Sequence, residues 1–174
     1  MTDVLNPSRR APTPAPATNL RTREPRGLIE PADATSRLAG LVGRPLSRVD
    51  TSLDRMVLSI AADPVHLVVI SGPVHLSGPS GAAQALASGQ AAGPLAAWVR
   101  RPVTDLGVDS GGGLHVGLGA DHLAVAAEAD HEAWEIRGMD GGLLVCLPGG
   151  RISLWAPTFG RIPRARSAHQ SDHR

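Results

Sequence analysis

Apolar and polar residues alternate with a period of two in short runs, which glycine, proline, aspartate and serine interrupt. This alternation is typical of antiparallel strands joined by tight turns, because successive side chains of a strand point to opposite faces. The sequence therefore predicts a mainly β domain of the α+β class with one aliphatic core. The residues expected to face that core are Met56, Leu58, Ile60, Val65, Leu67, Val69, Leu114, Val116, Leu118, Leu123, Val125, Trp134, Ile136, Leu143, Val145, Leu147, Ile152 and Leu154.

Two segments have a helical composition instead. Alanine and leucine dominate from Ala82 to Arg100, which predicts one intervening helix, broken or kinked near Gly93-Pro94. A shorter helical turn is expected from Ala32 to Leu41, with Asp33 or Thr35 as its N-terminal cap.

Two segments of the chain have similar sequences. Arg44-Pro45-Leu46-Ser47 returns as Arg101-Pro102-Val103-Thr104, and after a one-residue shift in the following turn the apolar positions from Met56 to Leu67 align with those from Leu114 to Val125. A duplicated three-stranded unit explains this, since each copy is too small to bury its own apolar face. The alternative is coincidence between two generic meanders, and the shared Arg-Pro pair favours duplication.

The flanking segments look different from this body. Residues 1–36 are rich in proline, alanine and arginine without periodicity, and residues 158–174 carry arginines with little to bury. Both are expected to be disordered tails around a single domain at 37–157. Arginine-bearing tails are most often solubilising extensions, with binding of nucleic acid or an acidic partner as the alternative.

Composition narrows the picture further. Hydrophobic residues make up 42% of the chain but aromatics only 2%, so Trp98, Trp134 and Trp155 are the largest packing units and are expected to anchor the interior. The Arg-Pro residues Arg44, Pro45, Arg101 and Pro102 are expected to be structural anchors as well.

The absence of lysine excludes two enzyme classes. All 17 basic residues are arginine, so neither a P-loop lysine nor a Schiff base is available.

A net charge of +1 argues against nucleic-acid binding as the main task of the molecule. The cytoplasm is the expected compartment, because Cys146 is the single cysteine and the sequence shows neither a signal-peptide pattern nor a long apolar run. The arginine, alanine and glycine bias suggests a GC-rich, actinobacterium-like source.

One segment concentrates candidate ligands and proton carriers. The run contains Asp121, His122, Glu128, Asp130, His131, Glu132 and Glu135. It lacks the second histidine of a zincin motif and is expected in a loop leading into a strand, so a solvated acidic loop is the competing interpretation of this cluster. No metal or other cofactor is expected.

Other reactive residue types have simpler explanations. Asp109-Ser110-Gly111-Gly112 partly resembles the surroundings of a chymotrypsin-like serine, but no histidine motif precedes it, and we expect a hairpin turn. Cys146 lies in an apolar run and is expected to be a buried packing residue. His66 and His75 are expected on the solvent face of their strands.

The C-terminal part of the domain carries a family resemblance. The run from His131 to Gly138, then Gly142 to Gly150, then Leu154-Trp155, resembles a family of small uncharacterised actinobacterial proteins, as does the segment around Gly43-Arg44-Pro45. The resemblance covers about residues 37–155 and implies kinship of fold. That family has no established activity to carry over to any residue.

These observations favour a non-enzymatic binding or interaction protein, because turn formers and core formers are present whereas a convergent acid-base or nucleophile set is not. The expected ligand is a protein partner, with an immunity-type or regulatory role. One alternative is a small metal-dependent hydrolase that uses the 121–135 cluster, and another is nucleic-acid binding by the tails. Exposed sheet edges also leave a homo-oligomer open.

Overall fold

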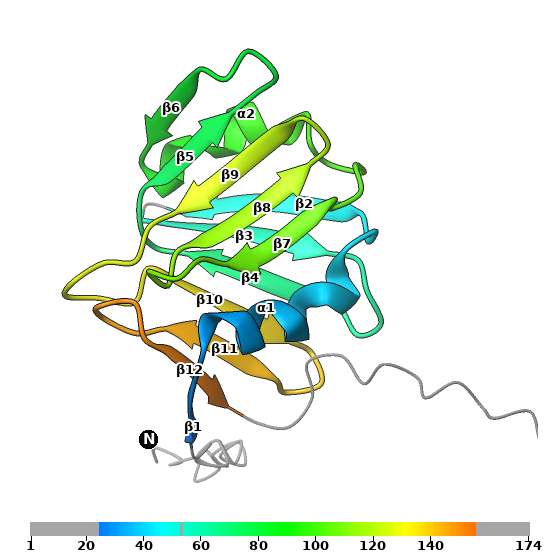
Figure 1. The fold of residues 1–174 in the computed structure, drawn as a ribbon. Helices are drawn as coiled ribbons and strands as arrows, with labels where there is room; N and C mark the ends of the chain where they lie inside the picture. The colour runs from blue at the N-terminus through cyan, green and yellow to red at the C-terminus, as the bar shows by residue number, and fades with distance from the viewer. Residues whose placement is uncertain (1–24, 53, 156–174) are drawn as a thin grey trace, which may run out of the picture.

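Two antiparallel sheets form the body of the protein in the computed structural model, which describes residues 25–52 and 54–155 (Figure 1). The expected mainly β class is confirmed. The seven-stranded sheet has the order β1-β12-β11-β10-β4-β3-β2, with β1 at Pro25–Ile29, β2 at Leu46–Ser52, β3 at Arg55–Ile60, β4 at His66–Ile70, β10 at Trp134–Gly138, β11 at Leu143–Cys146 and β12 at Ile152–Trp155. The five-stranded sheet has the order β6-β5-β9-β8-β7, with β5 at Val74–Ser77, β6 at Ala83–Leu86, β7 at Asp105–Val108, β8 at Leu114–Leu118 and β9 at Asp121–Val125.

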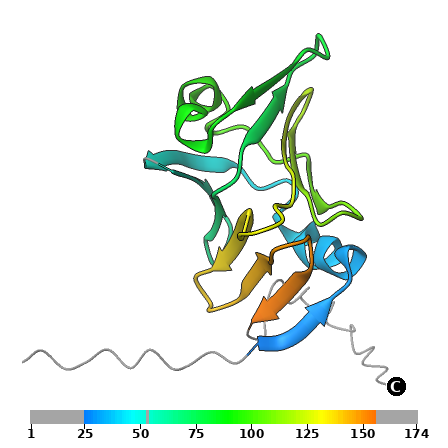
Figure 2. The same cartoon turned by 90° about the vertical axis from the view of Figure 1, so that its left-hand side faces the viewer.

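The inner faces of the two sheets enclose one aliphatic core (Figure 2). Met56, Leu58 and Ile60 are buried from one sheet, and Leu114, Val116, Leu118, Leu123 and Val125 are buried from the other. Trp134 is 1% exposed and is the largest of the fully buried side chains. The predicted faces of β3, β8, β9, β10 and β12 are thus confirmed.

A helix covers the free edge of β7. Helix α1 (Pro31–Leu38) continues into the 3-10 helix η1 (Ala39–Leu41), close to the expected 32–41 segment. Neither Asp33 nor Thr35 caps it, because the N-cap position is Glu30 and no side chain caps that end. Thr35 instead accepts a hydrogen bond from the Val108 amide at 2.8 Å and donates to the Val108 carbonyl oxygen at 3.3 Å. The helix therefore supplies the polar partners that an edge strand lacks.

The expected helix from Ala82 to Arg100 is wrong for most of its length. Residues Ala83–Leu86 form β6, which pairs with β5, and only Ser88–Gln90 (η2, a 3-10 helix) and Ala92–Ala96 (α2) are helical. Pairing with β5 overrides the weak helical preference of alanine. Pro94 fits inside α2 because it lies in the first turn, where the missing N–H has no intrahelical acceptor.

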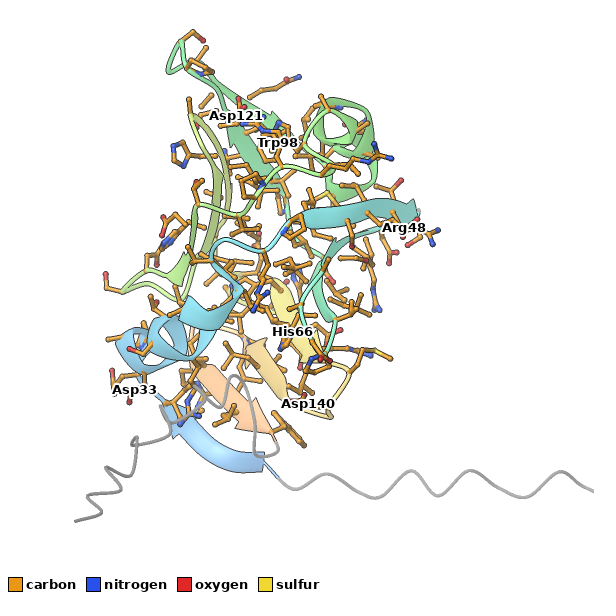
Figure 3. The ribbon with its side chains drawn as sticks, turned by 90° about the vertical axis from the view of Figure 1, so that its right-hand side faces the viewer. Asp33, Arg48, His66, Trp98, Asp121 and Asp140 are labelled. Carbon is orange, nitrogen blue, oxygen red and sulfur yellow. The ribbon has the colours of Figure 1, made fainter. Side chains whose placement is uncertain are left out.

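The expected face of β4 is also wrong. The strand turns His66, Val68 and Ile70 towards the core, whereas Leu67 and Val69 point outward and Val65 is 40% exposed. His66, expected on the solvent face, is 5% exposed and its Nδ1 lies 2.8 Å from the Pro64 carbonyl oxygen. Figure 3 shows this side chain towards the middle of the molecule. His75, in contrast, is exposed as expected.

A difference in turn length explains this reversal. Ile60 pairs with His66, whereas the equivalent Leu118 pairs directly with Asp121. The turn at 61–65 is therefore three residues longer than the turn at 119–120. An odd difference moves every following side chain to the opposite face of the strand.

The same reversal occurs in β11. Leu144 and Cys146 join the core cluster, whereas Val145 and the half-buried Leu143 belong to the other face. Leu147, also expected in the core, is half-buried beyond the end of the strand.

The two Arg-Pro segments lie side by side. Pro45 and Pro102 form an antiparallel bridge, and the amides of Val103 and Leu46 donate to the carbonyl oxygens of Arg44 and Arg101 at 2.9 Å each. The residues preceding the pairs, Gly43 and Arg100, both have positive φ, at 84° and 74°. The duplication itself stays a prediction, although the two halves use their Arg-Pro segments in the same way.

Parts of the expected tails fall inside the folded body. Residues 25–36, placed in the N-terminal tail by the sequence, form β1 and the start of α1. The predictions for residues 1–24 and 156–174, including nucleic-acid binding by the tails, lie outside the described residues. In the described ranges no helix has the length and apolar character needed to cross a membrane.

Candidate functional site

The outward face of the seven-stranded sheet carries a contiguous group of apolar side chains. Residues directly opposite in antiparallel strands share a face, so the strand register defines two outward rows. The first row contains Asp50, Val57, Val69, Glu135, Val145, Ser153 and Leu28. The second contains Arg48, Ser59, Leu67, Arg137, Leu143 and Trp155. We refer to these two rows as the outer face.

Burial confirms that this face is separate from the core. Val57, Leu67, Val69 and Leu143 are each half-buried, and none belongs to the core cluster. Val145 and Ser153 are buried, at only 4% and 3% exposed. The open part of the face therefore lies over β3, β4 and β10. Solvated sheet faces normally carry polar side chains, whereas strands that are apolar on both faces are typical of sheets covered on both sides.

An ion pair lies within the outer face. The Arg137 guanidinium Nη2 is 2.5 Å from the Glu135 Oε1, and the two side chains are 53% and 15% exposed. Their neighbours across the sheet are Val69 and Val145 on the row of Glu135, and Leu67 and Leu143 on the row of Arg137. The charges that these two rows carry on β10 are therefore paired with each other, and Arg48 and Asp50 form a second pair on β2, with Arg48 Nε 2.7 Å from Asp50 Oδ2.

The apolar surface continues into the turns at one end of the sheet. Met139 and Val65 are 68% and 40% exposed, and the Met139 amide donates to the Val65 carbonyl oxygen at 3.1 Å. Exposed hydrophobic residues in contiguous groups are a recognised mark of interaction surfaces.

The outward face of the five-stranded sheet has a different character. Its rows carry small residues and three histidines, namely Gly107, His115, Ala124, His75 and Ala85 in one row and Asp105, Gly117, His122, Ser77 and Ala83 in the other. His115 Nε2 lies 3.2 Å from Asp105 Oδ2 on the exposed surface.

The predicted 121–135 cluster is spread over three places. Asp121 begins β9 and its Oδ2 accepts from Arg101 Nη1 at 2.6 Å, while Arg101 also donates to the Leu118 carbonyl oxygen. His122 lies on the five-stranded sheet, and Glu135 lies on the seven-stranded sheet with Arg137. Figure 3 shows Asp121 at the same end of the molecule as Trp98 and far from Asp140.

Three residues of this segment do converge. One ligand atom each from Glu128, Asp130 and His131 lies within 4.8 Å of the others, in the loop between β9 and β10. Asp130 Oδ1 is 2.8 Å from His131 Nδ1, and this hydrogen bond is the main reason that the pKa of the exposed Asp130 carboxyl is lowered. Glu132 points into a neighbouring open depression of about 460 Å³, lined also by Asp54, Arg55, Ser71 and His131.

The residues at 109–113 form a turn, as expected. Asp109 Oδ1 accepts hydrogen bonds from the amides of Gly111 and Gly113 at 2.8 and 2.9 Å. The Asp109 side chain thus stabilises the β7–β8 hairpin, and nothing in this geometry activates Ser110. Cys146 is fully buried, and burial raises the pKa of its thiol to about 11.

The tryptophans differ in their surroundings. Trp98 is 7% exposed, and the Trp134 indole N–H donates to the Gly112 carbonyl oxygen at 3.0 Å. Trp155 is half-buried on the outer face, and its buried indole N–H has no acceptor within the described part of the chain.

Sequence reasoning missed the outer face, although the signal was present. The strands β3, β4 and β11 carry apolar residues at consecutive positions, as in His66-Leu67-Val68-Val69-Ile70. Such runs indicate strands that are covered on both faces.

Comparison with known proteins gives a family but no activity. No curated protein and no solved structure matches the chain. The model of the family described as "Family of unknown function (DUF6188)" matches residues 38–156, which include eleven of the twelve strands. This chain therefore belongs to the DUF6188 family of unknown function.

Proposed function

We propose that this chain is a non-enzymatic interaction domain that binds a protein partner on its outer face. The observation that carries the proposal is the group of half-buried apolar side chains on the outward side of β3, β4 and β11, namely Val57, Leu67, Val69 and Leu143. Covering apolar surface is favourable by roughly 25 cal/mol per Å². A protein is the partner that suits a flat face of this width, since small ligands prefer concave sites.

The biological setting of this function is part of the proposal. An immunity-type or regulatory role in the cytoplasm of an actinobacterium-like source fits the small size, the single cysteine and the residue bias. Descent from a duplicated three-stranded unit fits the shared Arg-Pro segments.

A co-purification experiment tests the proposal. The full chain is co-expressed with the products of the neighbouring genes and purified. Any co-purifying protein is then purified and titrated against the wild type by calorimetry. The Val69→Arg variant places a charge in the outer face and is expected to weaken binding at least tenfold. The matched control Ala124→Arg places the same charge on the outward face of the other sheet, where it should change affinity less than twofold. Equal effects of the two variants would contradict the use of the outer face.

A second candidate function is a metal-dependent hydrolase, favoured by the convergence of Glu128, Asp130 and His131. Carboxylate and imidazole ligands suit zinc or manganese. Titration of the purified chain with Zn²⁺ or Mn²⁺ would show one bound ion, lost in His131→Ala and retained in the control His122→Ala. Binding that persists in His131→Ala would rule out this site.

A further inference from the structure

We propose that the protein covering the outer face is a second copy of this chain, in a symmetric dimer formed face to face. This rests on the proposed function and names its partner. The two-fold axis would lie in the interface plane, perpendicular to the direction of β10, and would pass over that strand at Ile136. Such an axis places β10 of each copy antiparallel over β10 of the other.

The charges of the outer face fit this symmetry. Glu135 and Arg137 lie two residues apart on β10, on either side of the proposed axis. The axis brings Glu135 of each copy opposite Arg137 of the other, so one intramolecular pair becomes a network of four charges. Arg137 is 53% exposed and has five N–H donors, which leaves donors for a second carboxylate.

The apolar residues fit the same symmetry. An in-plane axis perpendicular to β10 keeps each strand opposite its own copy and exchanges the two rows. Val69 would then face Leu67 of the second copy on β4, next to the ion pairs. Sheets pack about 10 Å apart with interdigitating side chains, and residues of this size fill that space.

A symmetric interface must be self-complementary, because the same patch serves on both subunits. The outer face meets this requirement in charge and in the exchange of its rows. An unlike partner would have to provide an apolar surface with a matching acid and base, which this chain already carries.

Charge exchange tests the dimer directly in the full chain. Sedimentation equilibrium is expected to show a wild-type dimer. Glu135→Arg alone and Arg137→Glu alone each bring like charges together at the axis, and each should raise the dimer dissociation constant at least tenfold. Mixing the two variants should restore a heterodimer within threefold of the wild-type affinity. The control Asp105→Arg makes the same charge reversal on the outward face of the five-stranded sheet, where Asp105 pairs with His115, and should leave the dimer unchanged.

Several outcomes would overturn the proposal. They are a wild-type chain that stays monomeric at all concentrations, a dimer insensitive to the charge variants, or a mixture that does not reassociate. Circular dichroism identifies any variant that fails to fold, in which case Val69→Arg replaces it and should also give a monomer. A monomer that still binds another protein through the outer face would overturn the dimer but leave the proposed function standing.

Discussion

Trp134 of the seven-stranded sheet donates its indole N–H to the carbonyl oxygen of Gly112, 3.0 Å away in the β7–β8 turn of the five-stranded sheet. The bond is buried and joins the two sheets at the end of the core. The Asp109 side chain accepts hydrogen bonds from the Gly111 and Gly113 amides and so fixes the β7–β8 turn. The same turn presents the Gly112 carbonyl to Trp134.

The Trp134→Phe variant should lower the free energy of unfolding by about 1–3 kcal/mol. It keeps most of the aromatic packing but leaves the buried Gly112 carbonyl without this donor. Chemical denaturation measures the loss. Ile136→Val on the same strand removes only a methyl group, at a cost of about 0.5–1.5 kcal/mol, and should leave hydrogen exchange in the 109–113 turn unchanged. If Trp134→Phe also leaves that exchange unchanged, the bond does not couple the sheets.

Gly112→Ala should be more destabilising than Gly149→Ala. Both glycines have positive φ, 84° and 78°, so both substitutions incur the backbone strain of about 1 kcal/mol. A Cβ on Gly112 would also collide with the backbone of Gly150, whereas one on Gly149 meets no atom within 4 Å. Melting temperatures of the two variants should differ by several degrees, and equal values would contradict the close approach of the two turns.

Thr35→Val should remove the hydrogen bonds that hold the edge strand β7 to helix α1. The variant keeps the shape of the side chain but removes the hydroxyl that bonds both the N–H and the carbonyl of Val108. The expected loss is about 1–2 kcal/mol, with faster amide exchange at Val108. Ser36→Ala is the control on the same helix, because the exposed Ser36 hydroxyl donates to the Ala32 carbonyl within that helix. A similar loss in both variants would mean that the helix, and not the β7 edge, is affected.

The Cys146 thiol should resist modification in the folded protein. Burial is the main cause of its raised pKa of about 11, and the nearby charges of Asp109 and Glu132 add to the effect. An unfolded cysteine ionises near pH 9.0, so between about pH 9 and 11 the unfolded chain loses a proton that the folded chain retains. Stability should fall with rising pH across that range, and the fall should be smaller in Cys146→Ala. Rapid labelling of the native thiol by a disulfide reagent at pH 8 would contradict this prediction.

The sequence by itself determined where strands and turns occur, because these depend on local chemistry. Period-two alternation located β3, β8, β9 and β12, and the glycine-rich turns at 109–113 and 148–150 needed only residues that tolerate positive φ. The Arg-Pro echo also located two segments that lie together in space.

The tertiary structure decided which face of each strand is inside. In β4 and β11 both faces are apolar, so the pattern cannot separate core residues from outer-face residues, and the lengths of the turns and the pairing register choose between them. Pairing with β5 likewise made an alanine-rich segment a strand. The outer face itself arises only when Leu67, Arg137 and Leu143 are brought side by side by strands distant in the sequence, because strand register is a property of the assembled sheet.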